Sequence, residues 1–110
     1  GSSKKPLIVQ IHADWCRTCK KLEPTWKRIL DEFAHRSHTV RLDVSDRESY
    51  EASAEQARNL EIEDFFREYR RKTGTIAILG CGTRETPVLL RGEINLDKYR
   101  EAIARAESRC

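Results

Sequence analysis

Residues 7–20 read LIVQIHADWCRTCK, an apolar run followed at once by two cysteines that are separated by two residues. The run over 7–12 is rich in β-branched residues and is interrupted only by Gln10, which predicts a buried central strand. Residues three apart are neighbours on a helical turn, so Cys16 and Cys19 can close and open a small disulfide ring with little backbone movement. We interpret the two thiols as a redox pair.

A helix that begins near Cys16 makes the two thiols unequal. The first N–H groups of a helix have no intrahelical partners, and the positive end of the helix dipole lies there, which favours thiolate over thiol. A low thiol pKa is a common property of such motifs. Cys16 is therefore the predicted nucleophile, and Arg17 adds positive charge to the same turn.

A C-x-x-C pair also occurs as half of a zinc site, which normally has four ligands. The other cysteines and histidines of the chain are Cys81, Cys110, His12, His35 and His38. They form no second pair with finger-like spacing, so the sequence favours redox chemistry over metal binding and over thiols without a function. We expect no bound metal and no other cofactor.

The composition indicates one folded domain. The chain has 110 residues, of which 35% are charged and 38% hydrophobic, with a formal net charge of +3. No apolar run approaches the roughly 18 residues of a membrane span. The densest basic group, at 67–72, is interrupted by Glu68 and Tyr69 and predicts a solvated helix end. We therefore expect neither nucleic-acid binding nor membrane contact by this domain.

The N-terminal residues Gly1-Ser2-Ser3 look like a cloning remnant, and the absence of methionine fits a domain taken from a longer precursor. We expect residues 1–5 to be remnant and linker, and 6–110 to form a single domain. That domain is expected to be soluble, either cytoplasmic or exported behind an N-terminal segment since removed. Four cysteines do not decide between these compartments.

The remaining chain alternates strand and helix patterns. After the strand at 7–12, the sequence predicts a helix over about 16–33, a strand over 39–44, helical segments over about 46–60 and 62–69, strands over 75–79 and 86–90 joined by a turn at 80–82, and a last helix capped by Asn95. Pro24 is expected to kink the first helix. Ser45-Asp46-Arg47-Glu48 has the pattern of a capping box.

This order, with HADWCRTCK at 12–20, resembles the thioredoxin family and its active-site segment. Pro24 matches the proline of the family's active-site helix, and Gly92 matches the glycine before its last helix. The resemblance implies a mixed sheet of about four strands with helices on both faces. The connection from Ser45 to Gly74 is longer than in a minimal thioredoxin by about one helix, so we also expect an extra helical segment before the third strand. It also implies a thiol–disulfide oxidoreductase in which Cys16 attacks a substrate disulfide and Cys19 resolves the mixed disulfide.

The sequence departs from the family pattern in the strand before the dithiol. Family members usually carry a buried acid six residues before the nucleophile, and that position is Gln10, which cannot titrate. Asp14 is the nearest carboxylate in sequence, although we expect it to cap the helix that follows. His12, at the end of the strand, is a third residue that could modulate the thiolate.

A second departure concerns the cis-proline that faces the dithiol in this family. Aligning the last hairpin and helix puts Thr73-Gly74-Thr75 there, because Thr86-Pro87-Val88 leaves too little chain before the last helix. A non-proline residue pays about 2.5–4 kcal/mol to be cis, so a trans peptide and a wider groove are expected. The expected substrate groove consists of Trp15, Arg17, Thr18, Thr73 and Gly74.

The expected partners are protein disulfides or dithiols and a redox partner, with the domain itself a monomer. Two other functions remain open: a dithiol that holds zinc or an iron–sulfur cluster between two subunits, and a partner-binding module with little catalysis. The sequence does not decide between reductase and oxidant, although Arg17 favours a more oxidising pair. Cys81, between two glycines, and the terminal Cys110 are candidates for free reactive thiols.

Overall fold

The sheet is built around β1 (Leu7–His12), whose six residues are all buried. In the computed structural model, which describes residues 5–80 and 88–109, the strand order is β2-β1-β3-β4. β1 pairs in parallel with β2 (His38–Asp43) and antiparallel with β3 (Thr75–Leu79), and β3 pairs antiparallel with β4 (Val88–Arg91). The predicted four-stranded mixed sheet is confirmed.

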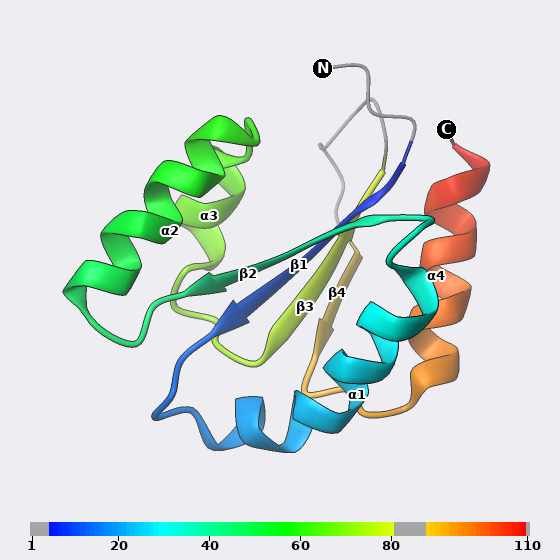
Figure 1. The fold of residues 1–110 in the computed structure, drawn as a ribbon, viewed down its shortest axis with the longest axis horizontal. Helices are drawn as coiled ribbons and strands as arrows, with labels where there is room; N and C mark the ends of the chain where they lie inside the picture. The colour runs from blue at the N-terminus through cyan, green and yellow to red at the C-terminus, as the bar shows by residue number, and fades with distance from the viewer. Residues whose placement is uncertain (1–4, 81–87, 110) are drawn as a thin grey trace.

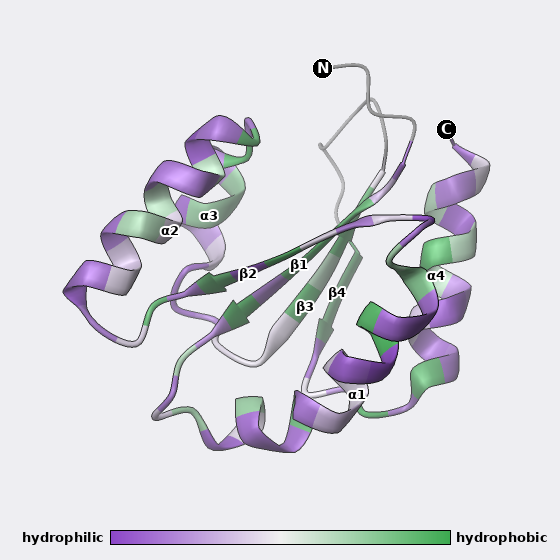
Figure 2. Cartoon of the chain, in the orientation of Figure 1, coloured by the Kyte–Doolittle hydropathy of each residue, from purple (hydrophilic) through white to green (hydrophobic). Residues whose placement is uncertain are grey.

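Helices cover both faces of this sheet, as predicted (Figure 1). α1 (Arg17–Phe33) and α4 (Leu96–Ser108) lie on one face, and α2 (Arg47–Asn59) and α3 (Glu63–Tyr69) lie on the other. Figure 2 shows apolar residues concentrated on the strands, while long stretches of the helices are hydrophilic. Because successive strand residues point to opposite faces, a fully buried strand requires cover on both sides.

Two apolar clusters fill the spaces between sheet and helices. The cluster beneath α1 and α4 contains Ile8, Leu22, Trp26, Ile29, Phe33, Ile76, Ile78, Tyr99, Ala102, Ile103 and Ala106. The cluster beneath α2 and α3 contains Leu7, Val9, Ile11, Val40, Leu42, Ala57, Ile62, Phe65, Phe66, Ala77 and Leu79. Phe65 and Phe66 are buried, so the extra helical segment supplies part of the core.

Most boundaries lie within two residues of those predicted. Pro24 lies inside α1, and Figure 1 shows this helix changing direction along its length, consistent with the lost hydrogen bond and ring clash of an internal proline. β2 begins and ends one residue earlier than expected. Asn95 caps α4, as predicted, and its side chain accepts from the backbone N–H of Asp97 at 3.0 Å.

The predicted capping box at Ser45 is wrong by one residue. Asp46 is the N-cap of α2, and its carboxylate accepts from the backbone N–H of Ser49 at 2.8 Å. This contact lowers the pKa of Asp46, since the hydrogen bond favours the ionised form. The Ser45 hydroxyl has different partners, which the site below describes.

The predicted turn at 80–82 and the start of the predicted strand at 86–90 fall largely outside the described residues, as do Cys81 and Cys110. Within the described part of the chain, no helix has both the length and the apolar character needed to cross a bilayer.

Candidate active site

Cys16 occupies the N-cap position of α1, so the helix begins beside the first thiol, as expected. Its Sγ accepts a hydrogen bond from the backbone N–H of Cys19 at an N···S distance of 3.1 Å. Its own N–H donates to the carbonyl of Ala13 at 3.1 Å, which closes the loop before the helix. The sulfur therefore receives both a backbone N–H and the positive end of the helix dipole, and each favours the thiolate.

The two cysteines differ in their access to solvent. Cys16 is 6% exposed and Cys19 is 0% exposed. The Cys19 Sγ lies 3.9 Å from the carbonyl oxygen of Ile11, at the floor of the site. Both cysteines pack with Ala13 and with the half-buried Val44. An incoming disulfide can therefore reach Cys16 but not Cys19.

Trp15, beside Cys16, is 65% exposed but held by hydrogen bonds around it. Its indole N–H donates to the carbonyl of Ser45 at 3.0 Å, and the Ser45 hydroxyl accepts from the backbone N–H of Asp14 at 2.7 Å. These contacts tie the loop before α1 to the turn after β2. The indole is thus a fixed wall of the site, and the Ser45 hydroxyl is engaged away from α2.

Gly74 lies against the dithiol turn. Its N–H donates to Ile11 and its carbonyl accepts from Gly92, both at 2.9 Å. A Cβ at residue 74 would lie 3.8 Å from the Cys16 Sγ but only 2.7 Å from the Thr18 Cγ2. The absence of a side chain at Gly74 therefore lets the first turn of α1 lie close to this residue. Contrary to expectation, the groove is not wider there, because Thr18 fills the space.

The other predicted groove residues surround the same turn. Thr73 and Thr18 are half-buried, and Arg17 is exposed on the first turn of α1. No peptide bond is cis among residues 5–80 and 88–109, so the bond before Gly74 is trans, as expected. The prediction that Asp14 caps α1 is wrong, because Cys16 is the cap.

Comparison with known proteins identifies the family. A family model described as Thioredoxin matches residues 1–65, more than half of the chain. The chain belongs to the thioredoxin family. The human (Homo sapiens) protein named DnaJ homolog subfamily C member 16 is 45% identical over 31 residues, which are 28% of this chain and 4% of that protein. Thioredoxin from Acidithiobacillus ferridurans is 34% identical over 44 residues, 40% of this chain and 41% of that protein.

The solved structure of chloroplastic thioredoxin z has a TM-score of 0.61 with this chain and 21% sequence identity. The superposition covers 97% of this chain and 82% of that one. This likeness shows the thioredoxin fold. The chain matches 4% of the length of the human protein and 41% of the length of the bacterial thioredoxin. Family membership supports a thioredoxin-like redox function.

Gln10 occupies the position where the thioredoxin family usually has a buried acid, and it is completely buried. Its Oε1 accepts from the Arg41 Nε at 2.7 Å, and Arg41 also donates to the carboxylate of Glu23. The Gln10 Nε2 has no hydrogen-bond partner among the described residues. An acidic side chain is therefore present in this network, but it comes from α1 rather than from β1.

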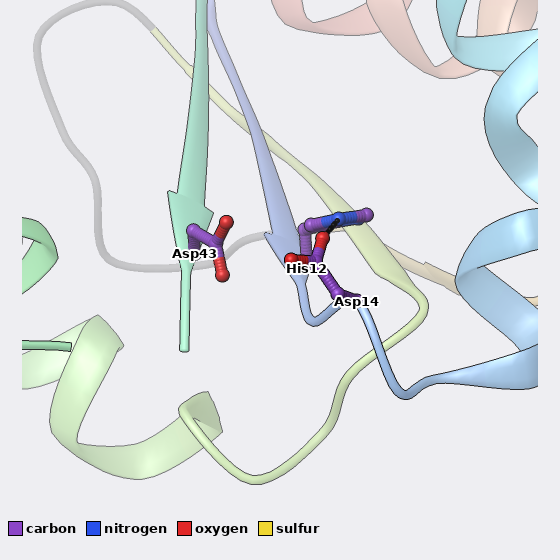
Figure 3. A group of neighbouring side chains, drawn as sticks. All are labelled: His12, Asp14 and Asp43. Carbon is purple, nitrogen blue, oxygen red and sulfur yellow. Dashed lines mark hydrogen bonds and ion pairs between the residues drawn. The ribbon is translucent and has the colours of Figure 1, made fainter. Parts of the chain in front are cut away.

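His12, Asp14 and Asp43 gather where β1 and β2 end (Figure 3). One ring nitrogen and two carboxylate oxygens of these residues lie within 4.8 Å of one another. The His12 Nε2 lies 3.1 Å from the Asp14 Oδ1, and Asp43 accepts from both the N–H and the hydroxyl of Ser45. Protein partners therefore account for this cluster, which fastens the two strand ends together.

Sequence reasoning did not find Asp43 or the hollow beside Trp15. Asp43 pairs with His12 in the parallel register of β1 and β2, a relation that strand alignment would have indicated. The hollow has a volume of about 250 Å³ and is lined by Trp15, Val44, Tyr50, Arg70 and Arg71. The interpretation of 67–72 as a solvated helix end is wrong for Arg70, which is half-buried there.

Proposed function

We propose that this thioredoxin-family protein exchanges disulfides with protein substrates through Cys16 and Cys19. The observation that carries the proposal is the difference in access: Cys16, at a helix N-terminus, keeps 6% of its surface exposed, and Cys19 is completely buried. Attack on a large partner needs an exposed thiolate, and release needs a second thiol within reach. A function in electron transport and redox homeostasis belongs to the same proposal.

In the reductive direction, the Cys16 thiolate attacks one sulfur of the substrate disulfide. The S–S bond breaks, a mixed disulfide forms, and the other substrate sulfur leaves as a thiolate. The Cys19 thiolate then attacks the Cys16 Sγ, which releases the second substrate thiol and leaves a Cys16–Cys19 disulfide. Two electrons pass to the substrate, and the two protons of the dithiol end on the two substrate thiols.

The test is a redox titration of protein in which Cys81 and Cys110 are both replaced by serine, so that only the dithiol responds. The oxidised fraction is measured in glutathione buffers from intrinsic tryptophan fluorescence, with Cys16→Ser as the blank. We expect a reversible two-electron transition that is absent from the blank. A potential near about −270 mV indicates a reductase, and one near about −120 mV an oxidant.

A trapping experiment tests the order of the two thiols. In the Cys19→Ser variant, the mixed disulfide with a disulfide-containing protein should accumulate, because no second thiol can resolve it. The Cys16→Ser variant should trap nothing, since Cys19 is completely buried. Equal trapping by both variants contradicts the assigned roles. Absence of any reversible transition would overturn the proposed exchange and favour metal binding or partner recognition.

A further inference from the structure

The hollow beside Trp15 adjoins the dithiol site, because two of the residues that line it, Val44 and Trp15, also lie next to the cysteines. Val44 lines the hollow and also packs against Cys16 and Cys19. Trp15 directly precedes Cys16, and its indole is held by the Ser45 carbonyl. A polypeptide with its sulfur at Cys16 can therefore place a neighbouring side chain in this hollow.

The hollow is also lined by two positively charged residues. Arg70 and Arg71 follow directly after α3, and Tyr50 comes from α2. The Arg70 guanidinium lies 5.5 Å from the Tyr50 ring centroid and donates a hydrogen bond to the Tyr50 hydroxyl. This contact holds the guanidinium in place, so less side-chain entropy is lost when a ligand binds.

Arg70 and Arg71 are not neutralised by any carboxylate that the structure describes. Within the described residues, no carboxylate forms an ion pair with Arg70 or Arg71, whereas Arg67, on the preceding turn, pairs with Asp64 at 3.2 Å. None of the five residues that line the hollow is acidic. Three acids are sequence neighbours of lining residues, and each has another partner: Asp14 lies beside His12, Asp43 accepts from Ser45, and Glu51 pairs with Arg47 at 3.5 Å. The hollow thus presents positive charge between apolar and aromatic walls.

We propose that this hollow binds the carboxylate side chain of an Asp or Glu that lies beside the reactive disulfide of a protein substrate. The guanidinium fork matches a carboxylate in geometry and charge, and Trp15 and Val44 would contact the methylene part of the side chain. The volume of about 250 Å³ lies below the roughly 300–1,000 Å³ of pockets for drug-sized ligands, which favours a single side chain over a nucleotide. This inference rests on the proposed exchange function and adds a preference for acidic substrates.

The test compares two disulfide peptides that are identical except for Glu or Gln next to the cysteine. Reduced protein is mixed with each peptide in a single turnover, and the second-order rate constant for peptide reduction is measured. A charge-assisted hydrogen bond contributes about 1.5–3 kcal/mol, so we expect the wild type to react about tenfold or more faster with the Glu peptide. The ratio should fall as salt is raised, because exposed charges are screened.

Arg71→Gln and Arg70→Gln should each bring the Glu-to-Gln ratio toward one. The matched control is Arg109→Gln, which removes one exposed positive charge at the end of α4, far from the start of α1 (Figure 1), and should keep the wild-type ratio. The ratio corrects for any general loss of activity in a variant. A wild-type ratio near one, or a ratio that survives in both variants, overturns the proposal.

A binding measurement separates this inference from the exchange function itself. In the double variant Cys16→Ser, Cys19→Ser no exchange occurs, and Trp15 fluorescence reports binding of the reduced peptides. Tighter binding of the Glu peptide, lost in Arg71→Gln, supports the pocket even if the redox titration fails. Equal affinities for the two peptides overturn the proposed carboxylate pocket. A short oligonucleotide that binds more tightly than the Glu peptide also overturns it.

Discussion

Replacing Gly74 by alanine tests both the backbone conformation and the packing that bring this residue to the dithiol. Gly74 has φ +84°, in the left-handed region, where an alanine pays about 1–2 kcal/mol. The added Cβ would also lie 2.7 Å from the Thr18 Cγ2, and overpacking of this kind costs about 1–3 kcal/mol. The lower entropy of the unfolded alanine chain offsets about 0.4–1 kcal/mol. We expect Gly74→Ala to lower the free energy of unfolding by about 1–4.5 kcal/mol.

Two other glycines separate these contributions. Gly92 also has a positive φ, +68°, but its added Cβ would lie 3.4 Å from the Thr18 Cγ2, so Gly92→Ala should cost only the backbone part, about 0.5–1 kcal/mol. Gly80 has no neighbour within 4 Å of an added Cβ and no positive φ. Gly80→Ala should therefore range from neutral to stabilising by about 1 kcal/mol.

The assay is urea unfolding at neutral pH with a reductant, analysed by linear extrapolation for all three variants. The same measurement in a Thr18→Ala background removes the atom at 2.7 Å, so Gly74→Ala should cost about 1–2 kcal/mol less there. Strict additivity of the two substitutions would refute the close contact between residues 18 and 74. A Gly74→Ala effect no larger than that of Gly80→Ala would refute the left-handed backbone as well.

Three further predictions concern buried polar groups. Burial raises the pKa of Tyr99 well above its usual value, so above about pH 10 the folded protein keeps a proton that the unfolded chain loses. The free energy of unfolding should therefore fall there by up to about 1.4 kcal/mol per pH unit more than in Tyr99→Phe. Urea unfolding at about pH 9–11 measures this, and an equal dependence of the unfolding free energy on pH in the two proteins would contradict it. The Ser53 hydroxyl accepts from the backbone N–H of Asp43 and donates to its carbonyl, both at 2.8 Å. Ser53→Ala should therefore lower the free energy of unfolding by about 2 kcal/mol in the same urea assay. A decrease under about 0.5 kcal/mol would show that these two hydrogen bonds do not stabilise the fold. Gln10 cannot titrate, so Gln10→Met should leave the pH profile of the disulfide-exchange rate unchanged, whereas Gln10→Glu should shift it. A shifted profile in Gln10→Met would show that residue 10 takes part in proton transfer.

Local sequence signals predicted the elements and the dithiol turn well. The apolar run at 7–12, interrupted by Gln10, became a strand buried on both faces, and Asn95 became the cap of the last helix. Cys16 is the N-cap of α1 because the helix starts directly after the strand and its loop. Such features depend on residues within a turn or two of one another, so periodicity and capping preferences are sufficient to find them.

The same signals failed where another hydrogen-bond partner competed for a side chain. Ser45 fits a capping box in sequence, but its hydroxyl accepts from the backbone N–H of Asp14, and Asp46 caps the helix instead. Asp14 fits a helix cap as well, but its carboxylate lies beside His12. The partner of Ser45 lies 31 residues away in the chain, which local preferences do not include, whereas His12 is only two residues from Asp14 and competes with the helix cap locally.

The sequence by itself determined that a reactive dithiol follows a buried strand in a thioredoxin-like order of elements. Only the tertiary structure decided what surrounds it: Gly74 against Thr18, and a hollow lined by both Trp15 and the arginines after α3. These contacts join segments far apart in the chain, and their positions depend on strand order, register and the packing of helices on the sheet. Sequence patterns record the faces that each element buries, whereas the pairing of those faces is settled only when the whole core is packed.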